Sequence, residues 1–259
     1  MKSLRNHVEM RRARNARVGR GRAESDTKDR GGPRISPAGP GGPDLESRVR
    51  LRAVSKRYGC GPTTVEALRE VDLDVRAAEF VAVIGPRGSG KTTLIEVVGA
   101  TQRPTSGEVL VCGRRIDDLD DRGRLEFRTA NIALAPQVPT LAPTLTVHET
   151  VVQAARMSRL HRPERKSNVL ISAFDLQLEA DVLVANLSAE SQQRLSVARA
   201  LAKDAPLLLL DEPLSAAPID ARRRLLAAVP ELVPPDSAIV LTTPDTEATP
   251  SVDRVVRLA

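Results

Sequence analysis

One stretch of the chain reads Gly85-Pro86-Arg87-Gly88-Ser89-Gly90-Lys91-Thr92-Thr93, and it follows directly on the apolar run 80–84. A short, continuous apolar run is typical of a strand that is buried on both faces of a parallel sheet. The nine residues match the phosphate-binding loop pattern G-x-x-x-x-G-K-[ST] between this strand and a helical pattern over 92–99. The stretch therefore predicts an α/β fold with a P-loop NTPase core, in which helices flank a mostly parallel sheet.

The residue types of this loop indicate how it would hold a nucleotide. Glycines let the backbone wrap a phosphate with its N–H groups pointing inward, and the following helix adds the positive end of its dipole. We expect all of residues 85–93 to contact the nucleotide. Lys91 would reach the β- and γ-phosphates, and Thr92 would be a ligand of Mg²⁺.

A second buried-strand pattern, over 206–210, ends in two carboxylates, Asp211 and Glu212. Open α/β sheets bind their ligands at the carboxyl ends of the strands, so both side chains are expected in the same site. Asp211 would hold Mg²⁺ through water, and Glu212 would polarise the water that attacks the γ-phosphate. Outside the first 45 residues the chain lacks an Asn-Lys-x-Asp element for reading guanine. A GTPase is therefore not expected.

The residues before the loop follow a different pattern. Val49, Leu51 and Ala53 alternate with arginines, and apolar residues at 71, 73 and 75 alternate with acidic or basic neighbours. Such alternation predicts strands with one face in solvent. We therefore expect a small N-terminal antiparallel sheet beside the parallel one.

Length and composition limit the other possibilities. The 259 residues are 41% hydrophobic and 28% charged, which suffices for one large α/β domain or two small ones. No apolar run approaches the roughly 18 to 20 residues of a membrane-spanning helix, and the N-terminus lacks the apolar segment of a secretory signal. Cys60 and Cys112 lie far apart and are expected to be reduced. A cytosolic location is the default expectation.

The formal charge of +6 belongs to the N-terminal tail. Residues 1–22 carry Lys2 and seven arginines against Glu9 alone, and nine of the thirteen residues 31–43 are glycine or proline. This composition cannot form a packed core, so residues 1–45 are expected to be disordered. The tail could be an arm for RNA or anionic lipid, but a solvated extension or a start codon placed too early is the preferred interpretation. No specific nucleic acid is expected as a partner.

Further motifs give the chain a family resemblance. They are Val65-Glu66-Ala67-Leu68, the run 104–110 (Pro-Thr-Ser-Gly-Glu-Val-Leu), Thr146-Val147-His148-Glu149 and Val252-Asp253-Arg254-Val255. With the loop and the acidic pair, they make the chain similar to the nucleotide-binding subunits of ATP-binding cassette (ABC) transporters, most of all to the macrolide-export and lipoprotein-release branch. The likeness runs from about Val49 to Leu258. It implies that residues 46–259 form one nucleotide-binding domain with an inserted α-helical subdomain at about 138–200.

The resemblance also implies roles for individual residues. Tyr58 stands where the family stacks an aromatic ring on adenine, although an ordinary strand tyrosine is the alternative. Gln137 matches the glutamine that touches Mg²⁺ and the attacking water and senses the membrane partner; the alternative is a surface glutamine. Ser188 matches the signature serine that binds the γ-phosphate from the opposing subunit. Residues 141–178 match the part that docks on the transmembrane subunits.

At three places the chain departs from the family pattern. The signature Leu-Ser-Gly-Gly-Gln is replaced at 187–191 by Leu-Ser-Ala-Glu-Ser, so that Glu190 would set a negative charge against a phosphate. Pro244 takes the place of the switch histidine, and proline can neither donate a hydrogen bond nor transfer a proton. The aspartate that follows the acidic pair, Asp220, comes two residues late. Arg87 could pair with Glu190 of an opposing chain and so compensate, or it could be an unrelated exposed arginine.

These residues together predict an ATP-binding subunit that uses ATP and Mg²⁺ and dimerises with a second nucleotide-binding subunit, of the same or another kind. It would hydrolyse ATP slowly, with Glu212, Gln137 and Lys91 as catalytic residues, and power a separate transmembrane permease for export. It would lie in the cytoplasm, on the inner face of the cell membrane. The alternative is an ATP-dependent regulatory switch with little or no hydrolysis. A soluble ABC protein acting on nucleic acid or ribosomes is a weaker third interpretation, because such proteins usually fuse two cassettes.

Overall fold

The computed structural model describes residues 47–158, 162–244 and 252–258, so the predicted tail 1–45 and Asp245 lie outside the described residues. An antiparallel sheet is built from β1 (Ser47–Tyr58), β2 (Val65–Arg76), β4 (Ser106–Val111) and β5 (Arg114–Arg115). A parallel sheet is built from β3 (Phe80–Ile84), β6 (Ile132–Ala135), β7 (Leu207–Asp211), β8 (Ala238–Thr243) and β9 (Arg254–Arg257). Their strand orders are β2-β1-β4-β5 and β6-β7-β8-β3-β9. The predicted α/β fold with a separate antiparallel sheet is confirmed.

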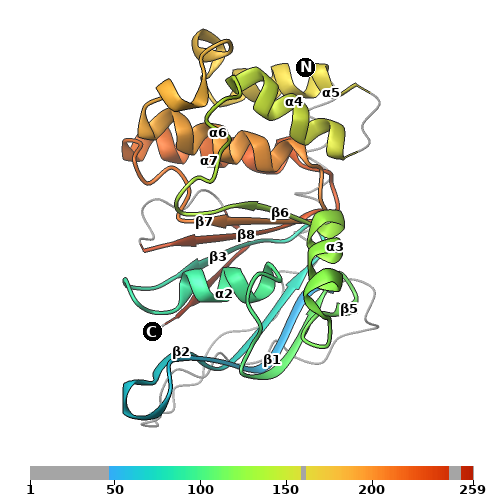
Figure 1. Cartoon of the computed structure of the whole chain (residues 1–259), viewed down its shortest axis with the longest axis vertical. Helices are drawn as coiled ribbons and strands as arrows, with labels where there is room; N and C mark the ends of the chain where they lie inside the picture. Colours follow the sequence, from blue (N-terminus) through green and yellow to red (C-terminus); the bar gives the residue numbers. More distant parts are fainter. Residues whose placement is uncertain (1–46, 159–161, 245–251, 259) are drawn as a thin grey trace.

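The helices are α2 (Lys91–Val98), α3 (Asp121–Asn131), α4 (Val147–Met157), α5 (Pro163–Ala173), α6 (Ala189–Ala202) and α7 (Ile219–Leu232). Short 3₁₀ turns lie at Gly61–Thr63, Gln177–Glu179 and Val184–Asn186. Figure 1 shows three layers: helices α4 to α7 cover one face of the parallel sheet, whereas α2 and α3 lie on the other face, towards the antiparallel sheet.

The antiparallel sheet follows from the alternation of apolar and charged residues. Leu51 of β1 pairs with Leu73 of β2 on one side and with Val109 of β4 on the other. All three side chains are buried, because this face of the sheet packs on α2 and the parallel sheet in a single hydrophobic cluster. The arginines that flank Leu51 in β1 point to the other face of the sheet, as the alternation requires.

The parallel sheet brings the ends of three strands together. All five residues of β3 and all five of β7 are buried, which explains their continuous apolar sequence. Strand β8 lies between them and pairs with both. At the edge, the Asp253 carboxylate accepts a hydrogen bond of 2.8 Å from the Phe80 N–H and so fixes β9 beside β3. Side chains that follow β3, β7 and β8 must therefore meet at one edge of the sheet.

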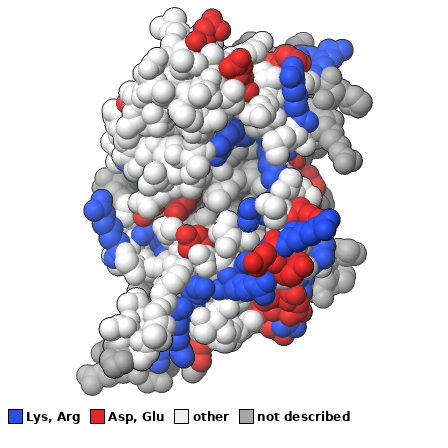
Figure 2. Space-filling view, in the orientation of Figure 1, with Lys and Arg blue, Asp and Glu red and all other residues white. Residues whose placement is uncertain are grey.

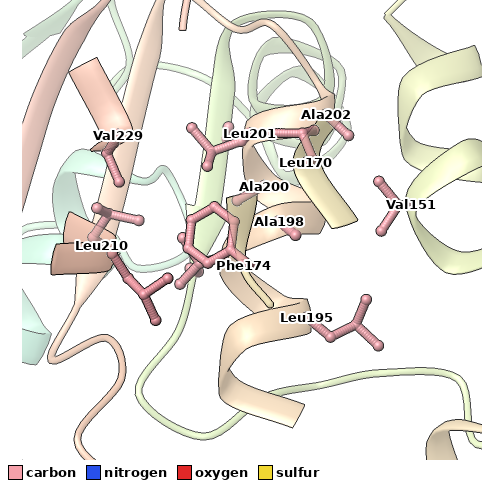
Figure 3. Packing of buried hydrophobic residues seen from close by; sticks show 14 of the residues in the cluster. Val151, Leu170, Phe174, Leu195, Ala198, Ala200, Leu201, Ala202, Leu210 and Val229 are labelled. Carbon is pink, nitrogen blue, oxygen red and sulfur yellow. The ribbon is translucent and has the colours of Figure 1, made fainter. Parts of the chain in front are cut away.

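The helical layer has its own hydrophobic cluster against the parallel sheet. Phe174, which follows α5, is fully buried and lies close to Leu195 of α6, Leu210 of β7 and Val229 of α7 (Figure 3). Helix α4 begins with a capping box, in which the Thr146 side chain accepts from the Glu149 N–H and Glu149 accepts from the Thr146 N–H. Among the described residues, no helix is long and apolar enough to cross a membrane.

Candidate nucleotide-binding site

The loop between β3 and α2 has a backbone that requires glycine at two positions. Gly90 has φ +88°, and a Cβ atom there would lie 2.1 Å from the Ala67 carbonyl oxygen. A Cβ atom on Gly85 would lie 2.4 Å from the Leu258 carbonyl oxygen. Helix α2 begins directly after this loop, and no side chain caps its N-terminal N–H groups. Together with the buried Ser89 hydroxyl, which has no hydrogen-bond partner among the described residues, these groups form a cradle of donors that suits a phosphate.

Lys91 is the buried cation of the site, with 4% of its surface exposed. Its Nζ donates to the carbonyl oxygens of Gly85 and Pro86, both at 2.8 Å, and lies 3.3 Å from Glu212 Oε1. The ammonium group is thus directed into the loop. Because an ammonium group is attracted more strongly to an anionic phosphate oxygen than to a neutral carbonyl oxygen, phosphate oxygens would compete well for it.

The acidic pair ends β7 opposite the loop. Asp211 is almost fully buried, and its Oδ1 accepts a hydrogen bond of 2.6 Å from Thr242 Oγ1. Burial raises the pKa of Asp211 above its ordinary value, although hydrogen bonds from Thr242 and Thr92 oppose the shift. Glu212 follows in a left-handed backbone conformation with φ +42°, which is uncommon for a non-glycine residue and is typical of functional sites.

Gln137, which follows β6, completes this group. Its Nε2 donates to Glu212 Oε2 at 3.2 Å. Contacts therefore link Gln137 to Glu212, Glu212 to Lys91, and Asp211 to Thr92. Residues predicted from three separate segments, 85–93, 137 and 211–212, therefore lie in one cluster at the carboxyl edge of the parallel sheet.

The donor set of this cluster fits Mg²⁺. Within the described part of the chain, no group of three or more His, Cys, Asp or Glu side chains could hold a metal alone. Mg²⁺ usually keeps several waters and binds through one or two carboxylates together with substrate phosphates. The Thr92 hydroxyl and the Asp211 carboxylate are hard oxygen donors of this kind, and they stand next to each other beside the phosphate loop.

Tyr58 lies at the end of β1, beside the first turns of α2. Its hydroxyl donates to Glu96 Oε2 at 3.3 Å, and Lys56 Nζ lies 5.0 Å from the centre of its ring. Burial raises the pKa of Tyr58, while a hydrogen bond from Thr93 opposes the shift. The ring is held by its hydroxyl and by the cation over one face, and 37% of the residue is exposed. This arrangement suits a stacking surface next to the phosphate loop.

The signature segment lies apart from this cluster, at the start of α6. Ser188 is the N-cap of α6: its Oγ accepts from the Ser191 N–H at 3.1 Å and lies 3.0 Å from Ser191 Oγ. Ser191 Oγ in turn donates to Glu179 Oε1 at 2.9 Å. The Ser188 hydroxyl is therefore engaged in capping its own helix, and helix α6 covers the opposite face of the sheet from α2 (Figure 1).

Glu190, in the first turn of the same helix, forms an ion pair with Arg194 one turn later. Sequence reasoning did not identify this pair, although the i, i+4 spacing of the two residues on a helix was the available signal. Arg87 is exposed on the phosphate loop. The suggested pairing of Arg87 with Glu190 of an opposing chain would have to compete with the pair inside each chain.

Two further contacts were missed by sequence reasoning. Gln193 holds the loop after Glu212, because its Nε2 donates to Ser215 Oγ at 2.9 Å and its Oε1 accepts from the Ala216 N–H at 2.8 Å. Thr242 contacts Asp211, as described above. The only signal for Thr242 was a pair of threonines at the end of an otherwise apolar strand. Pro244 follows β8 and is exposed, and Asp220 lies in the first turn of α7.

The chain is similar in sequence to a family of known proteins. Residues 68–215 match a family model described as "ABC transporter". The chain is 32% identical to the Macrolide export ATP-binding/permease protein MacB 2 of Aeromonas hydrophila over 82% of its own length, but it spans only 33% of that relative. It is 31% identical to the Uncharacterized ABC transporter ATP-binding protein MJ0796 of Methanocaldococcus jannaschii, covering 81% of this chain and 92% of that protein.

A solved structure matches in the same way. It is described as the dimeric structure of a post-hydrolysis state of the ATP-binding cassette MJ0796 bound to ADP and Pi. It superposes with a TM-score of 0.73 at 30% sequence identity, over 81% of this chain and 94% of that one. The residues that match the family model, 68–215, include the phosphate loop and the acidic pair.

Proposed function

Because the chain belongs to the ABC transporter family, we propose that it is an ATP-binding subunit that binds MgATP, dimerises and hydrolyses ATP slowly to power a separate transmembrane permease. The observation that supports this most is the cluster of Lys91, Thr92, Gln137, Asp211 and Glu212 at the carboxyl edge of the sheet. A dimer is supported by the matched cassette, whose solved structure is dimeric.

In this proposal the phosphate loop and Lys91 bind the triphosphate, and Thr92 and Asp211 hold Mg²⁺, which neutralises charge on the phosphates when bound. Gln137 and Glu212 bind the attacking water. Glu212 accepts hydrogen bonds from Gln137 and faces Lys91, so its carboxylate is oriented before the substrate arrives. Tyr58 stacks on the adenine.

Two residues support the proposal of slow hydrolysis. Pro244 cannot supply the polar contact that the family obtains from histidine, and the loss of one such preorganised contact typically lowers the rate by on the order of 10² to 10³. In addition, the Ser188 hydroxyl is engaged with Ser191 and is less available to the γ-phosphate of an opposing subunit.

Contact with a permease is supported by exposed apolar side chains. Val138 directly follows Gln137 and is 76% exposed, and Met157 at the end of α4 is 63% exposed. Figure 2 shows that the upper left of this face, over α6 and α7, is mainly uncharged, while basic and acidic residues lie together at the upper right, near α4 and α5, and lower down, beside α3 and the antiparallel sheet. On this face the basic residues are interleaved with acidic ones, which does not favour nucleic acid as the partner.

The permease would place the chain on the inner face of the cell membrane, and the likeness to export proteins favours export.

A membrane protein encoded next to this chain is the candidate partner. Co-expression should yield a complex that survives purification, and Val138→Asp should dissociate it while leaving ATP binding unchanged. A complex that is indifferent to Val138→Asp would contradict docking at this surface.

A second candidate function is a regulatory switch that binds ATP and hardly hydrolyses it. Pro244 and the altered signature at 187–191 favour this candidate. Single-turnover hydrolysis at saturating MgATP separates the two, with Glu212→Gln as the control that retains nucleotide binding. Phosphate release that is clearly faster than in Glu212→Gln supports the slow ATPase. Equal rates in the two proteins support the switch.

A further inference from the structure

Thr242 occupies the centre of the site although it belongs to none of the motifs that define it. Strand β8 pairs with β3, which runs into the phosphate loop, and with β7, which ends in the acidic pair. In this register Thr242 lies directly beside Val83 on one side and Asp211 on the other. It is fully buried, and the other residues of β8 are buried as well.

The hydroxyl of Thr242 contacts both acidic residues. Its Oγ1 donates to Asp211 Oδ1 at 2.6 Å and accepts from the Glu212 N–H at 3.0 Å. The Glu212 N–H also lies 3.1 Å from the Thr242 carbonyl oxygen. One side chain thus orients the Asp211 carboxylate and holds the backbone at the point where Glu212 takes its left-handed conformation.

The fold itself does not require this hydroxyl. Valine has the same branched shape, suits a buried strand equally well and would bury no polar atom of its own, although Asp211 Oδ1 would lose this donor. A buried hydroxyl is unfavourable unless it is hydrogen-bonded, and here each of its short bonds is to a residue of the proposed reaction. Groups that bond to a metal-ligating carboxylate fix its orientation, and their loss typically weakens metal affinity by about 10 to 100-fold.

We propose that Thr242 is a positioning residue, which sets the orientation of the Asp211 carboxylate towards Mg²⁺ and the backbone of Glu212 through a single hydroxyl. This inference rests on the proposed function, because it assumes that Asp211 holds Mg²⁺ with the nucleotide. Thr242 itself touches neither the substrate nor the metal.

The test compares ATP affinity with Mg²⁺ and with EDTA, by calorimetry on the full chain and its variants. Thr242→Val should weaken MgATP binding by about tenfold. The affinity for ATP measured in EDTA should stay within about twofold of the wild-type affinity, because the phosphate loop is unchanged. Thr242→Ser keeps the hydroxyl and should restore the wild-type ratio of the two affinities. If Thr242→Val does not fold, Thr242→Ala serves in its place.

Ser237→Ala is the matched control. Ser237, next to the start of β8, is fully buried and its hydroxyl donates to the Ala205 carbonyl oxygen at 2.9 Å, far from the acidic pair along the strand. This variant should lower thermal stability without changing the affinity ratio. A wild-type ratio in Thr242→Val would overturn the inference alone. Absence of ATP binding to the wild-type chain would overturn the proposed function and the inference with it.

Discussion

At the scale of single residues, Pro244 is the departure with the most direct chemical consequence. It follows the strand that holds Thr242 next to Asp211, at the position where the family has histidine. We expect Pro244→His to raise the single-turnover rate of ATP hydrolysis by roughly 10²-fold, because it restores one polar contact to the transferring phosphoryl group.

Pro244→Ala is the control for this prediction, since it removes the ring without adding a polar group. Its rate should stay at the wild-type level. If the histidine variant is no faster than the alanine variant, the missing histidine does not limit hydrolysis in this protein.

Some of the site residues could be predicted from the sequence and others could not. The sequence alone identifies the residues that lie in short, contiguous motifs directly after apolar strands. These are residues 85–93, Asp211 and Glu212. The role of Thr242 depends on the register between β7 and β8, strands that are separated by about thirty residues, and no local pattern contains that register. The Ser188 hydroxyl matched the family pattern, but only the structure reveals that Ser191 engages it.

At the scale of secondary structure elements, the start of α6 shows how the altered signature is accommodated. Glu190 lies near the positive end of the helix dipole, which favours a carboxylate, but an ATP phosphate from another subunit would approach the same end. Arg194 forms an ion pair with Glu190, and its positive charge partly neutralises the carboxylate at this end of the helix. We therefore expect Arg194 to reduce the repulsion of a phosphate at this end.

A double-mutant cycle in a Glu212→Gln background tests this expectation. Arg194→Ala should weaken ATP-dependent dimerisation several-fold, to about the extent of one partly buried ion pair. In Glu190→Gly the same substitution should have little effect, because the negative charge is gone. Sedimentation with and without MgATP measures the dimer. Equal effects of Arg194→Ala in both backgrounds would contradict the account.

At the other end of α6, Lys203 is a titratable group that makes the free energy of unfolding depend on pH. Lys203 Nζ donates to the carbonyl oxygens of Arg128, at 2.9 Å, and of Ile132, so it joins α6 to α3 and β6. Burial lowers the pKa of Lys203 from 10.5 to about 8. Between these two values the unfolded chain binds more protons than the folded one, so the free energy of unfolding should rise with pH.

Urea unfolding at several pH values between about 8 and 10.5 measures this rise. Lys203→Met should show a smaller rise than the wild type over the same range, because it lacks the group that titrates. The comparison isolates Lys203 from other groups that titrate there, since they are the same in both proteins. Identical slopes would show that Lys203 keeps its ordinary pKa.

The existence of most elements could be predicted, whereas the limits of the helical layer could not. Apolar runs fixed β3 and β7 within a residue, because strands buried on both faces leave an uninterrupted pattern. The helical subdomain was expected from about 138, but the first helix in this part of the chain, α4, begins at Val147, after its capping box at Thr146. Its extent as a subdomain, about 138–200, stays a prediction.

At the scale of the whole molecule, the three layers separate the two halves of the proposed ATP site. The phosphate loop, Lys91 and the acidic pair meet at one edge of the parallel sheet, while Ser188 starts a helix of the layer beyond it. In the proposed function, one chain binds a nucleotide through its phosphate loop, and its signature segment would contact the nucleotide of another chain. Nucleotide binding to the single chain is the claim on which dimerisation, hydrolysis and transport all depend.

Calorimetric titration of MgATP into the full chain tests that claim most directly, with Lys91→Ala as the control. The buried ammonium group is directed into the phosphate loop, so its removal should weaken binding strongly while the rest of the fold remains. The account predicts saturable heat with the wild-type chain and little or none with Lys91→Ala. No heat from the wild-type chain, or equal heat from both proteins, would contradict it.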